Sequence, residues 1–401
     1  MVETEVEASL QQWPRQRRSR QRRVLVFLTT GLLTVALFAA AVLWARGAYW
    51  APVRVDQTVD ASFTVAGPPP ALPWPAQGQA YVDIEGVGLL GSSGPADTEV
   101  PIASVTKTMT AYQVLRDHPL APDQDGPTLT ITPELFAASK STEAGESGIL
   151  LQVGEQLTLR QALLGMLLPS AGNLARLLAA WDAGSVAAFV DKMNAQARAL
   201  GMQHTNYADP AGISNLSEST AADQVRLGET VLNDAALAEM VATKAVKLPV
   251  AGVVTNTDEL LGMDGDIGIK TGSTSAAGGC LLFATRSAVS GVPVTIVGAV
   301  LGQPGTAWTI LDHAETAAKT LIEAVQRSLV ATTVVRSGST VAVLRQRGHA
   351  DVALTSAGDV TVVGWPSLGY RVAVSPNREL NVVSTLRPGT VVAASRLAGT
   401  S

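Results

Sequence analysis

The sequence has very little cysteine and histidine, and both scarcities limit its chemistry. The single cysteine, Cys280, excludes an intramolecular disulfide, and its apolar surroundings (Gly-Gly-Cys-Leu-Leu-Phe-Ala) predict a small buried side chain, not a reactive thiol. The four histidines are scattered without the spacing of metal ligands: His118, His204, His313 and His349. We therefore expect no metal site and no cofactor.

Charge is also scarce, and it is unevenly placed. Charged residues make up 16% of the 401 residues, and the formal net charge is -5. Residues 1–23 hold six arginines against three glutamates, a local +3, so the remainder sums to -5 minus +3, or -8. No basic cluster follows these arginines, and a nucleic-acid partner would require one. We expect no nucleic-acid partner.

A long uncharged apolar stretch follows the arginines, from Val24 to Ala45. Its 22 residues are enough for a helix to cross a hydrocarbon core about 30 Å thick. The arginines before it favour a cytoplasmic N-terminus, with all later residues outside the membrane. A cleaved secretory signal is the alternative, but its apolar region is usually only about 7–15 residues long, and Leu43, Trp44 and Arg46 suit cleavage poorly. We expect an uncleaved single-pass membrane anchor and an extracytoplasmic body.

Composition and periodicity divide the rest of the chain into three parts. A proline-rich segment predicts an extended linker. Two strands, several amphipathic helices, further strands and one long helix then predict an α/β (α+β) domain with an antiparallel sheet. Residues 221–243 are among the segments expected to be helical, and Lys247–Val254 is among those expected to be strands. Short Val-rich runs separated by turn residues predict a small all-β module at the end. The expected organisation is a cytoplasmic basic tail (1–23), a transmembrane helix (24–45), the linker (46–78), the α/β domain (79–330) and the β-rich domain (331–401).

Ser104 and Lys107 form a Ser-x-x-Lys pattern at the expected start of an apolar helix. A helix start places the serine oxygen near free backbone N–H groups, and one turn brings the lysine over the same face. A serine becomes a nucleophile when a neighbouring base takes its proton, and a lysine can do so when burial and nearby positive charge lower its pKa. The pattern arises about once by chance in a chain of this length, so a capping serine beside a solvated lysine is the alternative.

Two further motifs lie downstream. Lys270-Thr271-Gly272 falls in an expected strand, where the lysine offers a cation to a carboxylate, the threonine a hydroxyl and the glycine a close approach. Ser170 lies in a polar Ser-Ala-Gly-Asn segment between two apolar helices. For Ser170 the alternative is a helix cap.

Together, these motifs and their flanks resemble the low-molecular-weight D-alanyl-D-alanine carboxypeptidases, peptidase family S11 of the penicillin-binding, active-site-serine enzymes. The similar flanks are Pro101-Ile-Ala-Ser-Val-Thr-Lys-Thr-Met-Thr, Gly201-Met-Gln-His-Thr-Asn-Tyr-Ala-Asp-Pro-Ala-Gly and Gly268-Ile-Lys-Thr-Gly-Ser-Thr. The resemblance covers roughly residues 80–300. It implies a transpeptidase-like fold, with a five-stranded antiparallel sheet between helices and a helical insertion that carries Ser170.

The resemblance also implies a reaction. Ser104 would attack the penultimate D-Ala carbonyl of a peptidoglycan pentapeptide, forming an acyl-enzyme that water then hydrolyses. Lys107 would be the base, and Ser170 would pass the proton to the leaving D-Ala. β-Lactams would be inhibitors that acylate the same serine.

The expected substrate-binding residues lie on the Lys-Thr-Gly strand. Lys270 and Thr271 would hold the terminal carboxylate of the peptide, with Gly272 beside them. The backbone N–H groups of Ser104 and Ser273 would form the oxyanion hole.

One position departs from the family's Ser-x-Asn motif, since Gly172 stands where the asparagine is expected and Asn173 follows one residue late. That asparagine normally contacts the lysine base and the substrate backbone. Either Asn173 substitutes for it, because Gly172 allows the loop to shift, or one polar partner is missing. The alternative to an active carboxypeptidase is therefore a slow or inactive penicillin-binding, cell-wall binding protein. A β-lactamase ranks last, because the sequence shows no match to the pattern with a separate deacylating glutamate.

Overall fold

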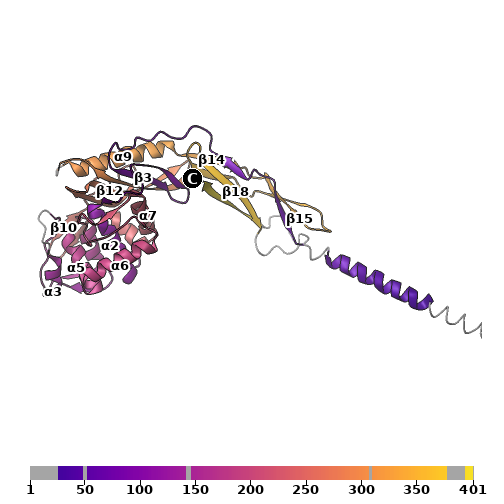
Figure 1. Ribbon diagram of the computed structural model, residues 1–401, viewed down its shortest axis with the longest axis horizontal. Helices are drawn as coiled ribbons and strands as arrows, with labels where there is room; N and C mark the ends of the chain where they lie inside the picture. Colours follow the sequence, from indigo (N-terminus) through magenta and orange to yellow (C-terminus); the bar gives the residue numbers. More distant parts are fainter. Residues whose placement is uncertain (1–25, 48–51, 141–145, 307–308, 377–392, 401) are drawn as a thin grey trace, which may run out of the picture. The chain divides into compact units, whose positions relative to one another are not determined.

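The computed structural model describes residues 26–47, 52–140, 146–306, 309–376 and 393–400 (Figure 1). The chain forms two compact units, and each is built from more than one stretch of sequence. The larger unit holds most of residues 63–333, and the smaller holds residues near 52–62, 334–360 and 371–376. The expected basic tail at residues 1–23 lies outside the described residues.

The larger unit is built on a five-stranded antiparallel sheet, as predicted. The strand order is β11 (Asp266–Thr274), β12 (Gly278–Val289), β13 (Val292–Gln303), β3 (Gln79–Ile84) and β4 (Gly88–Ser93). The central strands are apolar and buried on both faces, because helices cover both. Helix α9 (Ile310–Ser328) packs on β12 and β13 from one side, and α7 (Ala221–Leu232) packs on β13 and β3 from the other (Figure 1).

A group of helices packs around α2 (Lys107–Asp117) below this sheet in Figure 1. Its other members are α3 (Pro133–Ser139), α4 (Leu159–Leu167), α5 (Gly172–Ala183), α6 (Val186–Ala199) and α8 (Ala235–Val241). The helix expected over residues 221–243 is divided into α7 and α8. The side chain of Asp234 accepts hydrogen bonds from the first free N–H groups of α8, so a new helix begins there.

Short two-stranded ribbons frame these helices. They are β5 (Val100–Pro101) with β8 (Glu218–Ser219), β6 (Thr128–Thr130) with β7 (Gln156–Thr158), and β9 (Ala245–Leu248) with β10 (Gly252–Thr255). The single strand expected over Lys247–Val254 is therefore the β9–β10 hairpin.

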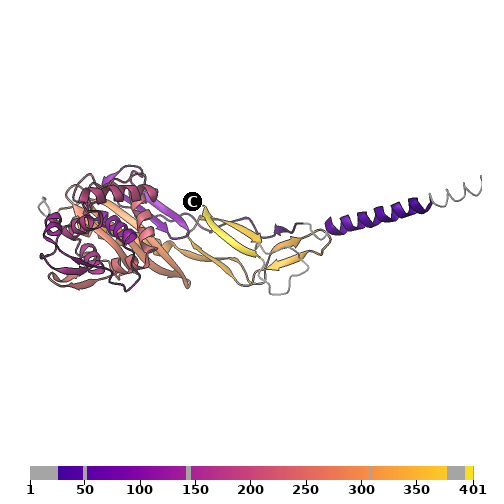
Figure 2. The ribbon, with the colours of Figure 1, turned by 90° about the horizontal axis from the view of Figure 1, so that it is seen from below.

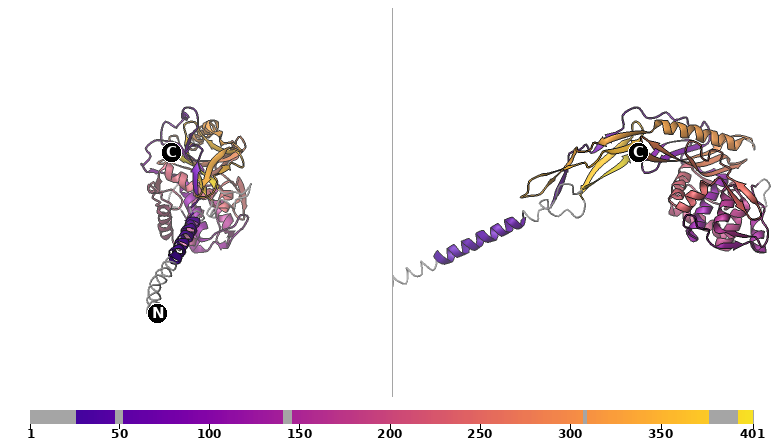
Figure 3. Two further views of the ribbon diagram at one scale, coloured as in Figure 1. Left: turned by 90° about the vertical axis from the view of Figure 1, so that its right-hand side faces the viewer. Right: turned by 180° about the vertical axis from the view of Figure 1, so that it is seen from behind.

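The strands after residue 329 form three small sheets. Strand β14 (Val330–Val335) pairs with β17 (Val360–Gly364), β15 (Thr340–Arg345) with β16 (Val352–Thr355), and β18 (Gly369–Pro376) with β19 (Ala393–Thr400). Figure 3 shows the late strands in yellow beside indigo strands from the start of the chain. Those early strands are β1 (Arg54–Gln57), paired with β15, and β2 (Ser62–Thr64), paired with β18.

Strands β1 and β2 fall inside the segment expected to be a linker, residues 46–78. Exposed and half-buried residues alternate along both strands, as in a strand with one covered face. The prolines of the segment begin only at Pro52, and most lie after residue 67. The linker prediction therefore does not hold for β1 and β2, and it stays a prediction for the residues after them.

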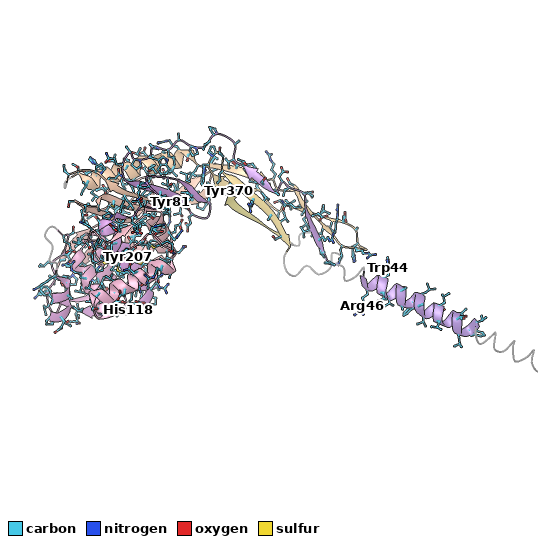
Figure 4. The ribbon with its side chains drawn as sticks, in the orientation of Figure 1. Trp44, Arg46, Tyr81, His118, Tyr207 and Tyr370 are labelled. Atoms are coloured by element: carbon cyan, nitrogen blue, oxygen red, sulfur yellow. The ribbon has the colours of Figure 1, made fainter. Side chains whose placement is uncertain are left out.

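The N-terminal helix Val26–Gly47, indigo in Figure 2, has 22 residues and a mean hydropathy of 2.3, and none of its residues is buried. Trp44 and Arg46 lie near its C-terminal end (Figure 4). By length and composition this helix is able to cross a membrane, either as an anchor or as part of a secretory signal.

Candidate active site

Ser104 and Lys107 lie in contact at the junction of a short helix and a long one. Ser104 belongs to a 3-10 turn, η1 (Ala103–Thr106), and Lys107 is the first residue of α2. The Nζ of Lys107 donates to the Oγ of Ser104 over 2.7 Å and to the carbonyl oxygen of Ala211 over 2.7 Å. Lys107 is fully buried, so it is not the solvated side chain of the alternative interpretation.

The charge state of Lys107 depends on its surroundings. Burial, together with the positive charge of Lys270, lowers the pKa of Lys107 to about 7. Arg176 acts in the same direction, whereas the carboxylates of Glu146 and Asp209 oppose it. Near neutral pH a substantial fraction of the amine is therefore unprotonated and able to accept the Ser104 proton.

A tight loop around Asp209 positions the carbonyl group that Lys107 contacts. The Oδ1 of Asp209 accepts from the N–H groups of Ala211 over 2.7 Å and Gly212 over 2.6 Å. A Cβ on Gly212 would stand 1.8 Å from the carbonyl oxygen of Ala103, so only glycine fits there. Ala103 itself has a φ of +47°, a strained conformation directly before the serine that this close packing maintains.

The Lys-Thr-Gly strand β11 lies against the turn that carries Ser104. A Cβ on Gly272 would stand 2.9 Å from the backbone nitrogens of both Ser104 and Val105, so the glycine permits this close approach. Ser273 follows it and is exposed, paired with Gly279 of β12. The expected oxyanion-hole residues, Ser104 and Ser273, thus belong to two elements that pack together, η1 and β11.

Lys270 and Thr271 are both buried on this strand. Burial lowers the pKa of Lys270 to about 8, although the charge of Asp258 opposes the shift. The Nζ of Lys270 donates to the Oγ1 of Thr271 over 3.3 Å, and that oxygen lies 2.6 Å from the Oγ1 of Thr257. Thr257 thus fixes the hydroxyl of Thr271, a contact that the sequence did not suggest.

Ser170 lies between α4 and α5 with a φ of +60°, an uncommon conformation for a residue with a side chain. Its Oγ is buried and has no hydrogen-bond partner among the described residues. Buried hydroxyls are normally paired, so this one is available to a ligand or a transferred proton. The helix-cap alternative does not hold, because Ala171 is the residue that precedes the first turn of α5 and no side chain caps it.

Asn173 does not point toward Lys107. Its Nδ2 donates to the carbonyl oxygen of Ile149 over 2.7 Å, and its Oδ1 accepts from the N–H of the same residue over 3.3 Å. The space beside Gly172 is occupied instead by Glu146, whose Oε1 lies 1.5 Å from the place of a Cβ on Gly172. The shifted-loop interpretation is thus not what the structure shows.

Other residues singled out by type have structural roles. Burial raises the pKa of the Cys280 thiol to about 12, which makes it inert near neutral pH. His118, labelled in Figure 4, contacts Asp182 at 3.0 Å and the ring of Trp181. Within the described ranges, no group of three or more His, Cys, Asp or Glu residues is placed to hold a metal ion.

The sequence interpretation missed several residues that shape the site: Glu146, Arg176, Asp209, Ala211 and Thr257. Only Asp209 carried a local signal, because Asp-Pro-Ala-Gly is a turn sequence in which the aspartate bonds the following backbone. The others reach the site through the tertiary fold.

The fold and the site together define an active-site-serine hydrolase of the penicillin-binding class. A family model described as D-alanyl-D-alanine carboxypeptidase, peptidase family S11, matches residues 79–304, and the chain belongs to this family. Enzymes of the family work through a serine acyl-enzyme and are sensitive to β-lactams.

Individual relatives agree with this assignment. A D-alanyl-D-alanine endopeptidase of Pseudomonas aeruginosa is 34% identical over 244 residues, which cover 58% of this chain and 75% of that protein. A D-alanyl-D-alanine carboxypeptidase of a Streptomyces species is 32% identical over 241 residues, 55% of this chain and 79% of that one.

Solved structures show the same fold. The crystal structure of a Streptomyces DD-transpeptidase has a TM-score of 0.54 and 28% identity, and it covers 63% of this chain and 98% of its own. The D-alanyl-D-alanine carboxypeptidase DacD from Francisella tularensis has a TM-score of 0.58 over 83% of this chain and 92% of its own, at 19% identity. The second comparison bears on the fold alone.

Proposed function

We propose that the protein removes the terminal D-alanine from peptidoglycan pentapeptides, as a serine carboxypeptidase with Ser104 as its nucleophile. The observation that carries the proposal is the 2.7 Å contact between the Nζ of fully buried Lys107 and the Oγ of Ser104. Nucleophile and base are already within hydrogen-bond distance, as this chemistry requires.

In the first half of the reaction, the Oγ of Ser104 attacks the carbonyl carbon of the penultimate D-Ala while its proton passes to the Nζ of Lys107. The C–N bond then breaks, and the leaving amine of the terminal D-Ala takes a proton through the Oγ of Ser170. The product is an ester between the peptide and Ser104. The unpartnered Ser170 hydroxyl supports this assignment, since it has a free donor and free acceptor capacity.

In the second half, water attacks the ester carbon and gives one proton to the Nζ of Lys107. The bond between that carbon and the Oγ of Ser104 then breaks, Lys107 returns the proton to the Oγ, and the shortened peptide leaves as a carboxylate whose remaining proton goes to the solvent. The N–H groups of Ser104 and Ser273 stabilise the oxyanion in both halves, and one such donor typically contributes about 10²–10³ in rate. Lys270 and Thr271 bind the terminal carboxylate, which favours an exopeptidase because a buried cation is best satisfied by a free chain end.

Endopeptidase action is the second candidate, because two relatives bear that name. Full-length protein in detergent should be given a pentapeptide ending in D-Ala-D-Ala, the same peptide with an amidated C-terminus, and a cross-linked peptide dimer. We expect D-alanine release from the first only. Cleavage of the dimer at a comparable rate would assign the endopeptidase activity instead.

The site also faces the outside of the cell in our proposal. The N-terminal helix anchors the chain, and the six arginines before it keep the N-terminus in the cytoplasm. Peptidoglycan peptides are then accessible to the catalytic unit.

A further inference from the structure

The site has a carboxylate where its family has an asparagine side chain. Gly172 leaves an open space at the third position of the Ser-x-Asn motif, and the Oε1 of Glu146 occupies it, only 1.5 Å from the place of a Cβ on Gly172. The Cδ and Cγ of the same side chain would be 2.5 Å and 3.0 Å from that Cβ. A side chain at position 172 and the Glu146 side chain would thus occupy the same space, so Glu146 can lie here only because residue 172 is a glycine.

Glu146 is firmly held in this place. Its two carboxylate oxygens accept from Arg176 of α5 over 2.7 Å and 2.8 Å, a bidentate pair. Its side chain is only 5% exposed. The residues after it are bound to α5 as well, since the N–H of Gly172 donates to the carbonyl oxygen of Ser147 over 2.8 Å and Asn173 makes its two bonds to Ile149.

We propose that Glu146 is a positioning residue that replaces the family's asparagine and stabilises the ammonium form of Lys107 which arises when the Ser104 proton is transferred. The proposal rests on the proposed function, in which Lys107 is the base. The asparagine of the Ser-x-Asn motif has a neutral amide, whereas the Glu146 carboxylate carries a negative charge.

The electrostatics of the pocket agree with this role. Lys270 on β11 and Arg176 on α5 both favour the neutral form of Lys107. Glu146 and Asp209, which lies on the loop between α6 and β8, favour the charged form. The lysine is otherwise fully buried beside a second buried lysine. Glu146 is therefore one of two carboxylates that keep its proton affinity sufficient for a base.

A purely structural counter-ion for Arg176 is the competing explanation, and a pH profile separates the two. Glu146→Gln keeps the shape and one acceptor but removes the charge. The acylation rate is measured against pH with a labelled penicillin on full-length protein in detergent. Without the negative charge the pKa of Lys107 falls, so we expect the acid limb, the part of the profile in which the rate rises with pH, to move to lower pH by roughly half a unit or more. The control is Glu155→Gln, another buried carboxylate, which bonds the N–H groups of Gln152 and Val250 and should leave the limb in place.

Exchanging the two positions provides a second test. Gly172→Asn alone should lower the acylation rate about tenfold or more, because the new Cβ would overlap the Glu146 carboxylate. Glu146→Ala alone should also lower it. In the double variant the overlap is gone and the amide is restored, so the rate should recover to within a few-fold of wild type. Such recovery is the signature of coupled positions.

The outcomes also separate this proposal from the one on which it rests. Persistent labelling of Ser104→Ala would overturn the proposed function itself. The role of Glu146 alone would be overturned by a different set of results. The wild type is labelled and Ser104→Ala is not, but Glu146→Gln leaves the pH profile of acylation unchanged. In addition, the double variant loses as much rate as the two single variants together.

Discussion

Gly272 and Ser104 lie so close together that any side chain at position 272 would collide with the backbone of the nucleophile turn. The added Cβ would stand 2.9 Å from the nitrogen of Ser104. This nitrogen carries one of the two N–H groups assigned to the oxyanion hole. The glycine of the Lys-Thr-Gly motif therefore allows β11 to approach the backbone of Ser104 this closely.

We predict that Gly272→Ala lowers the rate of Ser104 acylation by about 10²–10³, the typical effect of losing one oxyanion-hole donor. The turn must move away from β11 to accept the methyl group. Stopped-flow acylation by a fluorescent penicillin measures this rate. Gly358→Ala is the control, because the space around that glycine is open. Equal rates in the two variants would contradict the prediction.

The pKa of Lys107 predicts the pH dependence of the same reaction. Because burial lowers this pKa to about 7, the amine is charged below pH 7 and neutral above it. Only the neutral amine accepts the serine proton, so acylation should rise about tenfold per pH unit below 7 and level off above it. Lys107→Met should abolish acylation. A flat profile between pH 5 and 9 would show that Lys107 is not the base.

A buried carboxyl group at the start of the Lys-Thr-Gly strand, Asp266 of β11, predicts how stability changes with pH. Burial, with the charge of Asp258, raises the pKa of Asp266 to about 8. Between about pH 4 and 8 the folded chain keeps a proton that the unfolded chain has released, so stability falls as pH rises through this range. The Oδ1 of Asp266 accepts from the N–H of Gly268 over 2.8 Å, and an asparagine oxygen can do the same.

Asp266→Asn should therefore flatten the decline of Tm between pH 5 and 8.5 without loss of the fold. A change of 1 kcal/mol corresponds to roughly 2–4 °C for a domain of this size, so differential scanning fluorimetry has the required resolution. The exposed Asp123→Asn serves as the control. If both variants follow the wild-type curve, the proton is not held at Asp266.

Membrane anchoring gives a further prediction. Full-length protein should stay with membranes after an alkaline carbonate wash, and removal of residues 26–47 should release it. A cysteine placed in the catalytic unit should react with a membrane-impermeant reagent added to whole cells whose outer layers have been removed. Recovery of a shortened chain, without the N-terminal helix, in the soluble fraction would identify that helix as a secretory signal.

Much of this architecture was predictable from local patterns. The central sheet and most of the helices follow from hydrophobic periodicity, and Ser104, Lys107 and Lys270 carry recognisable spacing. Over residues 221–243 the apolar period predicts a single helix, although the Asn233-Asp234 pair is a helix-cap signal that divides it.

The role of Gly172 was not predictable in this way. From the sequence alone, a glycine at the asparagine position indicates that the polar side chain is lost. In the fold, Glu146 fills the space from a segment 26 positions earlier, and Arg176 holds it there. No spacing rule connects these residues. The pairing of β1 and β2 with late strands was equally hidden, because strand partners distant in sequence leave no local signal.

These early strands have a consequence for any shortened form of the protein. Strand β1 covers one side of β15, and its Val55 packs on the small core of Ala342, Leu344 and Leu354. A polypeptide that began at Gln79 would leave the flanks of β15 and β18 with bare rows of N–H and C=O groups, which are templates for pairing with another molecule. A chain that begins at residue 52, after the membrane helix, keeps both rows covered. The form that begins at Gln79 should therefore self-associate more than the form that begins at residue 52, while their catalytic rates should differ less.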